Sequence, residues 1–81
     1  MAGTIQSIER AAAILRLLSG RNRRLGVVQL AGELDLPKTT VHGILRTLAS
    51  VGFVEQDPDS GKYQLGAALL HMGSSLSLIH I

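Results

Sequence analysis

The sequence predicts a mainly α-helical (α+β) domain with three helices, a two-stranded hairpin and a fourth helix. Two patterns support this fold class. Aliphatic residues recur at helical spacing through most of the first 51 residues. Between residues 53 and 65, two short segments in which the side chains alternate as in β-strands flank a turn-forming centre. With 81 residues, 46% of them hydrophobic, the chain has enough apolar side chains for one small core and no room for a second.

The first helix is expected over about Ser7–Ser19. Ser7 suits the N-cap, and Gly20 suits the position that follows the helix. One stripe at helical spacing is expected to face the core, and its members are Ile8, Ala11, Ala12, Leu15 and Leu18. Ile14 and Leu17 widen this stripe, and we expect them to point toward a partner subunit.

A very short strand at residues 25–27 and a second helix over about Val28–Leu34 come next. Asp35 tolerates a left-handed backbone, so it suits the turn after this helix. Pro37 fits the first turn of a third helix because its missing N–H has no helical partner there. This third helix is expected over residues 37–51, before Gly52.

The hairpin and the fourth helix complete the predicted fold. Residues 53–56 and 62–65 alternate, and the segment Asp57–Gly61 between them has the composition of a turn. A helix over about Ala67–Leu76 follows. Two helices joined by a tight turn, with a hairpin after them, constitute a winged helix-turn-helix arrangement. We therefore assign residues 5–66 to this domain and residues 67–81 to the stub of a linker helix with a tail.

The third helix has two unlike sides when residues are placed at 100° intervals. Its inner side is aliphatic, with Val41, Ile44, Leu45 and Leu48. Its outer side carries short donors and one long cation but no acid, and it comprises Thr39, His42, Gly43, Arg46, Thr47 and Ser50, with Lys38 beside its start. Such a face suits the major groove of DNA, because hydroxyls and arginine reach base edges and phosphates there. The alternative is an ordinary solvated face, which usually includes Asp or Glu.

Within this face, four residues are expected nearest the bases: Thr39, Thr40, His42 and Arg46. Gly43 would let the helix approach closely, with Thr47 beside it, and Lys38 would contact phosphates. Lys62 on the hairpin and Arg23 and Arg24 in the loop after the first helix are further candidates for backbone contacts. A plain solvated loop is an equally good interpretation of the arginines, and Glu55, Asp57 and Asp59 count against a wing that grips DNA strongly.

Composition and motifs disfavour other classes of function. The net charge is +2, and the chain has no cysteine for a disulfide or a thiolate metal site. His42 has no His or acid three or four residues away, so we expect no metal. No nucleophile-elbow, Walker or HExxH motif is present, so we expect no catalytic residue and no cofactor. Without a signal peptide or a convincing membrane span, a cytoplasmic protein with no membrane partner is expected.

Several segments in order resemble the N-terminal DNA-binding domain of the IclR family of bacterial regulators. They are Ser7–Ala11 with Ile14 and Leu15, Leu36–His42, Leu45–Leu48, Gly52–Val54 and Tyr63–Gly66. The stretch Val41–Leu48, with Gly52–Asp57 after it, is most similar to the family's actinobacterial glycerol-operon regulators. Many family members have Arg at the position of Gly43, so one of their possible base or phosphate contacts is missing here.

The resemblance implies a transcriptional regulator that binds a double-stranded DNA operator as a homodimer, with the first helix and the helix after the wing helping the subunits associate. It also implies a C-terminal domain, absent from this chain, through which a small-molecule effector would act. Residues 77–81 do not resemble the family's linker helix, so we expect a truncation or a non-native tail. The alternative function is a winged-helix module for protein–protein contact or dimerisation, without a specific DNA site.

Overall fold

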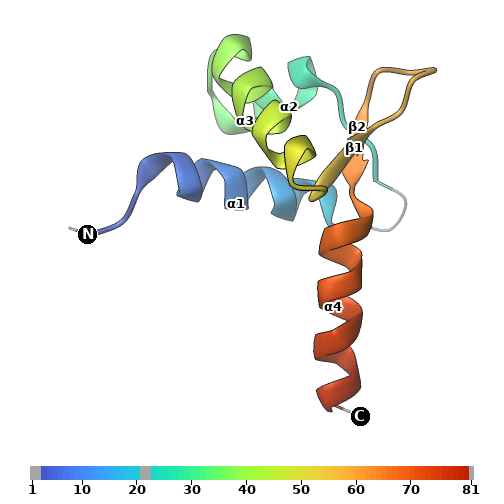
Figure 1. Ribbon diagram of the computed structural model, residues 1–81. Helices are drawn as coiled ribbons and strands as arrows, with labels where there is room; N and C mark the ends of the chain where they lie inside the picture. The colour runs from blue at the N-terminus through green and yellow to red at the C-terminus, as the bar shows by residue number, and fades with distance from the viewer. Residues whose placement is uncertain (1–2, 21–22, 81) are drawn as a thin grey trace.

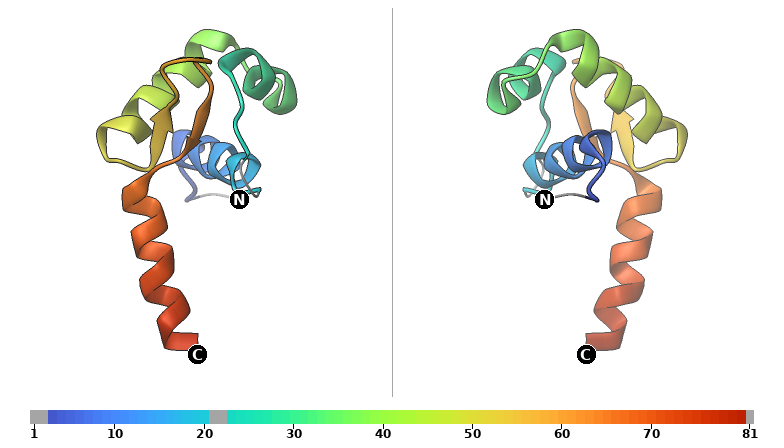
Figure 2. Two further views of the ribbon diagram at one scale, coloured as in Figure 1. Left: turned by 90° about the vertical axis from the view of Figure 1, so that its right-hand side faces the viewer. Right: turned by 90° about the vertical axis from the view of Figure 1, so that its left-hand side faces the viewer.

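The computed structural model describes residues 3–20 and 23–80, with side chains up to Ser74. Its elements, in chain order, are α1 (Gln6–Leu18), α2 (Val27–Leu34), α3 (Lys38–Ser50), β1 (Val54–Gln56), β2 (Tyr63–Leu65) and α4 (Ala67–His80) (Figure 1). The three N-terminal helices and the hairpin pack together, and α4 projects away from them (Figure 2). This is the winged helix-turn-helix arrangement that the sequence predicts.

The start of α1 corrects one prediction. The N-cap is Ile5, and Ser7 lies inside the helix. The carbonyl of Ile5 accepts hydrogen bonds from the backbone N–H groups of Ile8 and Glu9 at 3.1 and 3.0 Å. The first turn is thus closed by the backbone, without a side-chain cap.

The turn between α2 and α3 uses the residues that the sequence singled out. Asp35 has φ 54° and ψ 49°, which is the expected left-handed conformation. The N–H of Leu36 then donates to the carbonyl of Ala31 at 3.1 Å. Pro37 is the N-cap of α3 rather than its first helical residue, because its ψ of 146° is extended. Its carbonyl accepts the first helical hydrogen bond, from Val41 N–H at 3.1 Å.

The hairpin is antiparallel, with Val54 opposite Leu65 and Gln56 opposite Tyr63. Each strand is one residue shorter than expected. The strand predicted at residues 25–27 is reduced to one bridge, in which Leu25 and Tyr63 exchange two backbone hydrogen bonds of 3.0 and 2.8 Å. The segment before α2 is therefore fastened along the outer edge of β2.

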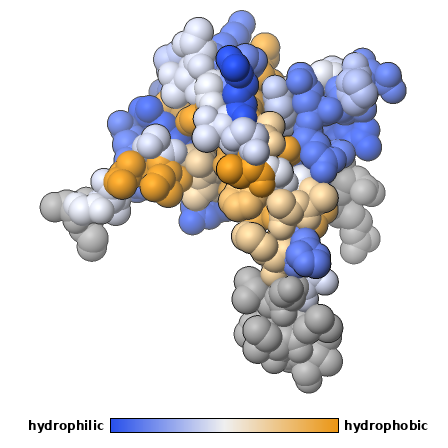
Figure 3. All heavy atoms as spheres, viewed as in Figure 1, coloured by the Kyte–Doolittle hydropathy of each residue, from blue (hydrophilic) through white to orange (hydrophobic). Residues whose placement is uncertain are grey.

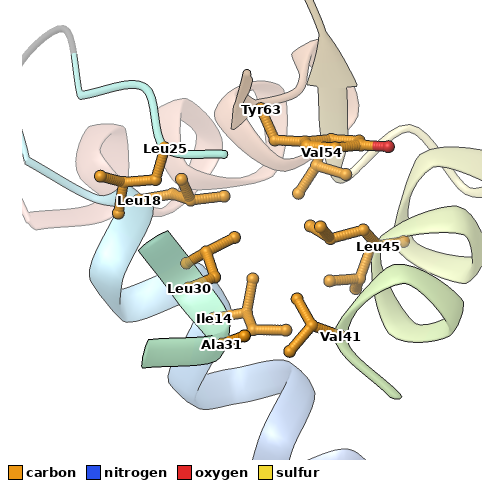
Figure 4. Close-up of a cluster of buried hydrophobic side chains, with 10 residues drawn as sticks. Ile14, Leu18, Leu25, Leu30, Ala31, Val41, Leu45, Val54 and Tyr63 are labelled. Carbon is orange, nitrogen blue, oxygen red and sulfur yellow. The ribbon is translucent and has the colours of Figure 1, made fainter. Parts of the chain in front are cut away.

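The core lies between α1, α2, α3 and the hairpin (Figure 4). Its buried members are aliphatic apart from one tyrosine: Ile14, Leu18, Leu25, Leu30, Ala31, Val41, Leu45, Leu48, Val54 and Tyr63. The predicted stripe of α1 is rotated in the structure. Ile14 is fully buried, whereas Ile8 is 63% exposed. Ile14 thus belongs to the core and does not point toward a partner, and Ile8 lies at the surface.

The final helix, α4, is four residues longer than expected, because no glycine or proline interrupts it after Gly73. Leu70 and Met72 are exposed on it. Among the described residues, none of the helices combines the length and apolar character needed to cross a bilayer. The same residues contain no cluster of three or more His, Asp or Glu side chains suited to a metal ion.

Candidate nucleic-acid interface

The outer face of α3 is held in place by the core behind it. Val41, Leu45 and Leu48 are buried, and they fix the rotation of the helix about its axis. The opposite side is exposed and includes Lys38, Thr39, His42, Gly43, Arg46, Thr47 and Ser50. No residue of α3 is acidic. The surface over this helix is accordingly white to blue in Figure 3, and it presents donors and positive charge with no carboxylate among them.

Two hydroxyl groups on this face are turned toward the backbone of their own helix. Thr47 Oγ1 donates to the carbonyl of Gly43 at 3.0 Å, and Ser50 Oγ donates to the carbonyl of Thr47 at 2.6 Å. Together with Arg46, these residues border a shallow hollow of about 360 Å³ on the outer side of α3, which is wide open to solvent. The sequence placed Ser50 on this face but did not single it out as a site residue, although its spacing from Gly43 is two helical turns.

Thr40 lies on the flank of α3 that faces α1. It is half-buried, whereas the other predicted residues of this helix are exposed. Thr40 and Thr47 border an apolar groove of about 640 Å³ between α1 and α3, whose other side includes Ile8 and Leu15. Four of the five residues that the sequence assigned to the core stripe of α1 therefore line an open groove beside the candidate DNA face, whereas the fifth, Leu18, is buried in the core as expected.

Of the two predicted arginines, Arg24 lies beside the hairpin and Arg23 lies near the start of α2. Arg24 Nε donates to Gln64 Oε1 at 3.0 Å, and its guanidinium lies 3.9 Å from the carboxylate of Asp57. Arg24 thus stabilises the hairpin through Gln64 and Asp57, and these contacts form without DNA. Arg23 is exposed near the start of α2. Arg21 and Asn22, which complete the predicted loop, lie outside the described residues.

Two of the three acids that counted against the wing have structural partners. Asp57 Oδ2 accepts hydrogen bonds from the backbone N–H and the hydroxyl of Ser60 at 3.1 and 2.6 Å. The hydroxyl bond, the backbone bond and the nearby Arg24 hold the pKa of Asp57 below its usual value. Glu55 Oε2 accepts the N–H of Ala67 at 3.0 Å and so caps the start of α4. Lys62 remains exposed on the hairpin.

Comparison with known proteins adds a family match. Residues 7–58 match the IclR helix-turn-helix domain. The chain is 60% identical over 80 residues to the glycerol operon regulatory proteins of Streptomyces griseus and Streptomyces coelicolor, a match that covers 99% of this chain and 32% of each relative. It is 33% identical over 73 residues to the transcriptional repressor IclR of Escherichia coli, covering 90% of this chain and 27% of that protein. This chain therefore spans about a third of the length of its relatives.

Solved structures give the same result for the fold. A crystal structure of an IclR transcriptional regulator from Alicyclobacillus acidocaldarius superposes with a TM-score of 0.83 at 38% identity, covering 88% of this chain and 29% of that one. An IclR family regulator from Brucella abortus superposes with a TM-score of 0.79 at 32% identity, covering 90% and 28%. The arrangement of helices and hairpin is thus shared with solved regulators.

Proposed function

This chain belongs to the IclR helix-turn-helix family, and from that premise we propose that it is the operator-binding part of a transcriptional regulator, with α3 in the major groove of double-stranded DNA. The observation that carries the proposal is the outer face of α3, which is exposed, free of acids and held by a buried aliphatic side. A helix of this kind can approach the phosphates without repulsion and offer side chains to base edges. The similarity to operon regulators disfavours a module that only contacts proteins.

The residues divide into two roles. Thr39, His42 and Arg46 are exposed on the outer face of α3 and are proposed to lie nearest the bases, with Thr40 at the edge of the contact. Lys38 at the start of α3 and Lys62 on the hairpin are proposed to contact phosphates, which position the protein without reading sequence. Arg24 is given no direct role, since its side chain is engaged by Gln64 and Asp57.

We further propose that the regulator binds its operator as a homodimer through α1. Ile5, the N-cap of this helix, and Ile8 within it are 60% and 63% exposed, and Ile8 also lines the groove between α1 and α3. A second copy of α1 would cover these side chains and remove their apolar surface from water. Two recognition helices related by a two-fold axis would then require a palindromic site.

The remaining parts of the proposal concern the longer protein. Because the relatives are about three times as long, an effector-binding domain outside this chain is proposed to control DNA binding. The relatives from Streptomyces are named for the glycerol operon, so an operon of similar metabolic type is the proposed target. Operator binding would place the protein in the cytoplasm with the chromosome.

A selection experiment tests the proposed function. The chain is mixed with a pool of random duplexes at low ionic strength, and bound duplexes are recovered and sequenced. We expect a recurring motif, arranged as an inverted repeat when the chain dimerises. We also expect the logarithm of affinity to fall linearly with the logarithm of salt, by about 0.9 for each phosphate contacted. Failure to retain any duplex at low salt would reject the proposal, and retention without a motif would reduce it to non-specific binding.

A further inference from the structure

The hollow on the outer side of α3 exists because Gly43 has no side chain. Its other borders are Arg46, Thr47 and Ser50, so its members stand at i, i+3, i+4 and i+7 on one helix face. A β-carbon built on Gly43 would meet no atom within 4 Å beyond its own helix backbone. The fold therefore does not require glycine here, and the residue costs the helix stability relative to alanine. Gly43, unlike other open helical glycines such as Gly32, lies on the outer face of α3, which points to a role in contacting DNA.

The chemistry of the hollow limits what it can receive. Each hydroxyl group has a single hydrogen, and the hydrogens of Thr47 and Ser50 are both donated to backbone carbonyls of α3. Neither residue has a donor left for a ligand. The two hydroxyl oxygens can still accept hydrogen bonds. The rest of the lining is apolar and consists of the bare Cα of Gly43, the γ-methyl of Thr47 and the aliphatic stem of Arg46. Only the guanidinium at the rim still offers donors.

We propose that the hollow receives the 5-methyl group of a thymine, which makes Gly43 a specificity-determining residue of the DNA interface. The inference rests on the proposed function and adds the identity of one base. Thymine is the only DNA base that presents a methyl group in the major groove, and its O4 acceptor lies beside that methyl. The methyl needs no donor, while Arg46 is placed to donate to O4 or to an acceptor of the neighbouring base.

Uracil substitution tests the proposal directly, because it removes the methyl group and leaves every hydrogen-bonding atom of the base in place. Each thymine of the selected duplex is replaced by uracil, one position at a time. We expect one position in each half-site at which affinity falls about fourfold, the equivalent of exposing one buried methyl group. Equal affinity for thymine and uracil at every position would overturn the proposal.

Two alanine variants assign the effect to the hollow. Gly43→Ala places a methyl group in the space that the thymine methyl would occupy. The ratio of the affinity for thymine to the affinity for uracil is therefore expected to fall toward one. Gly32→Ala is the matched control, because Gly32 is also an exposed helical glycine with no atom within 4 Å of its built β-carbon. It should keep the wild-type ratio. Both variants are expected to retain the wild-type circular dichroism spectrum.

The possible outcomes are distinct. If Gly43→Ala keeps the full thymine preference, another residue reads the methyl and the proposal is wrong. If the wild-type chain retains no duplex from a random pool, the proposed function itself fails, and the role of Gly43 fails with it. If binding is strong and sequence-dependent but indifferent to uracil, only the role of Gly43 is rejected.

Discussion

Gly66 lies directly against Gly52, and a β-carbon on Gly66 would overlap the carbonyl oxygen of Gly52. Two backbone hydrogen bonds hold the contact. The N–H of Gly66 donates to the carbonyl oxygen of Phe53 at 2.7 Å, and the N–H of Ala68 donates to the carbonyl oxygen of Gly52 at 3.2 Å. The end of α3 and the start of α4 are thus joined at a point where only glycine fits.

We therefore expect Gly66→Ala to destabilise the domain by about 2 kcal/mol or more, since the added methyl meets backbone that cannot move aside cheaply. Urea unfolding followed by circular dichroism measures the change. Gly32→Ala is again the control and is expected to leave stability equal or higher, by up to about 1 kcal/mol. A Gly66→Ala chain as stable as the wild type would show that the joint can relax.

Replacing Arg46 by alanine is expected to cost about 1–3 kcal/mol of binding free energy on the selected operator and much less on random duplex, if it reads a base edge. Fluorescence anisotropy with both duplexes measures the difference. An equal loss on both would make Arg46 a phosphate contact.

Lys62→Ala is expected to weaken binding to all duplexes alike and to reduce the salt slope by about 0.9, as for the loss of one phosphate contact. Salt titrations of the variant and the wild type give the two slopes. A loss confined to the selected operator would contradict this assignment.

The rotated core face of α1 predicts very unequal effects on stability for two isoleucines. Ile14→Ala removes a fully buried side chain and is expected to lower the free energy of unfolding by about 2–5 kcal/mol. Ile8→Ala, at an exposed position, is expected to change it by less than about 0.5 kcal/mol. Under the proposed dimer, Ile8→Ala should instead weaken self-association, which sedimentation equilibrium would detect. Unchanged self-association would place the dimer contact elsewhere.

The turn at Asp57 should give stability a dependence on acid pH. Because the folded state lowers the pKa of this carboxyl, its contribution to stability is present above its ordinary pKa of 3.8 and is lost as the pH falls through the lower pKa of the folded state. Asp57→Asn is expected to flatten the stability profile below pH 3.8. Asp59→Asn removes the same charge from the same turn without touching the bonds to Ser60, and it should keep the profile. Identical profiles for the two variants would refute the assignment to Asp57.

Local chemistry made the helix-turn-helix predictable. The left-handed conformation of Asp35 and the position of Pro37 next to the start of α3 depend on backbone preferences of single residues. The face of α3 was predictable for a similar reason. Its aliphatic residues occupy one side only, so the helical spacing alone determines which side is buried and which side is exposed.

The errors arose where the sequence is ambiguous or the contact is distant. In α1, aliphatic residues and alanines occupy most of the circumference, so packing against α2 and α3 decides that Ile14 is buried and Ile8 is not. Arg24 and Gln64 are 40 residues apart, and Glu55 and Ala67 are 12 apart. No local pattern indicates that these charged side chains have structural partners. The lack of free hydroxyl donors at the hollow depends on the orientations of Thr47 and Ser50, which the spacing alone does not specify.

The joint at the base of α4 also has a mechanical consequence. The helix spans 14 residues, or about 21 Å along its axis, and its other end stands clear of the domain (Figure 2). A tilt of about 10° at the joint would swing that end by roughly 4 Å while shifting Gly66 very little. A large displacement of the far end of α4 would thus correspond to a small displacement of the backbone at Gly66.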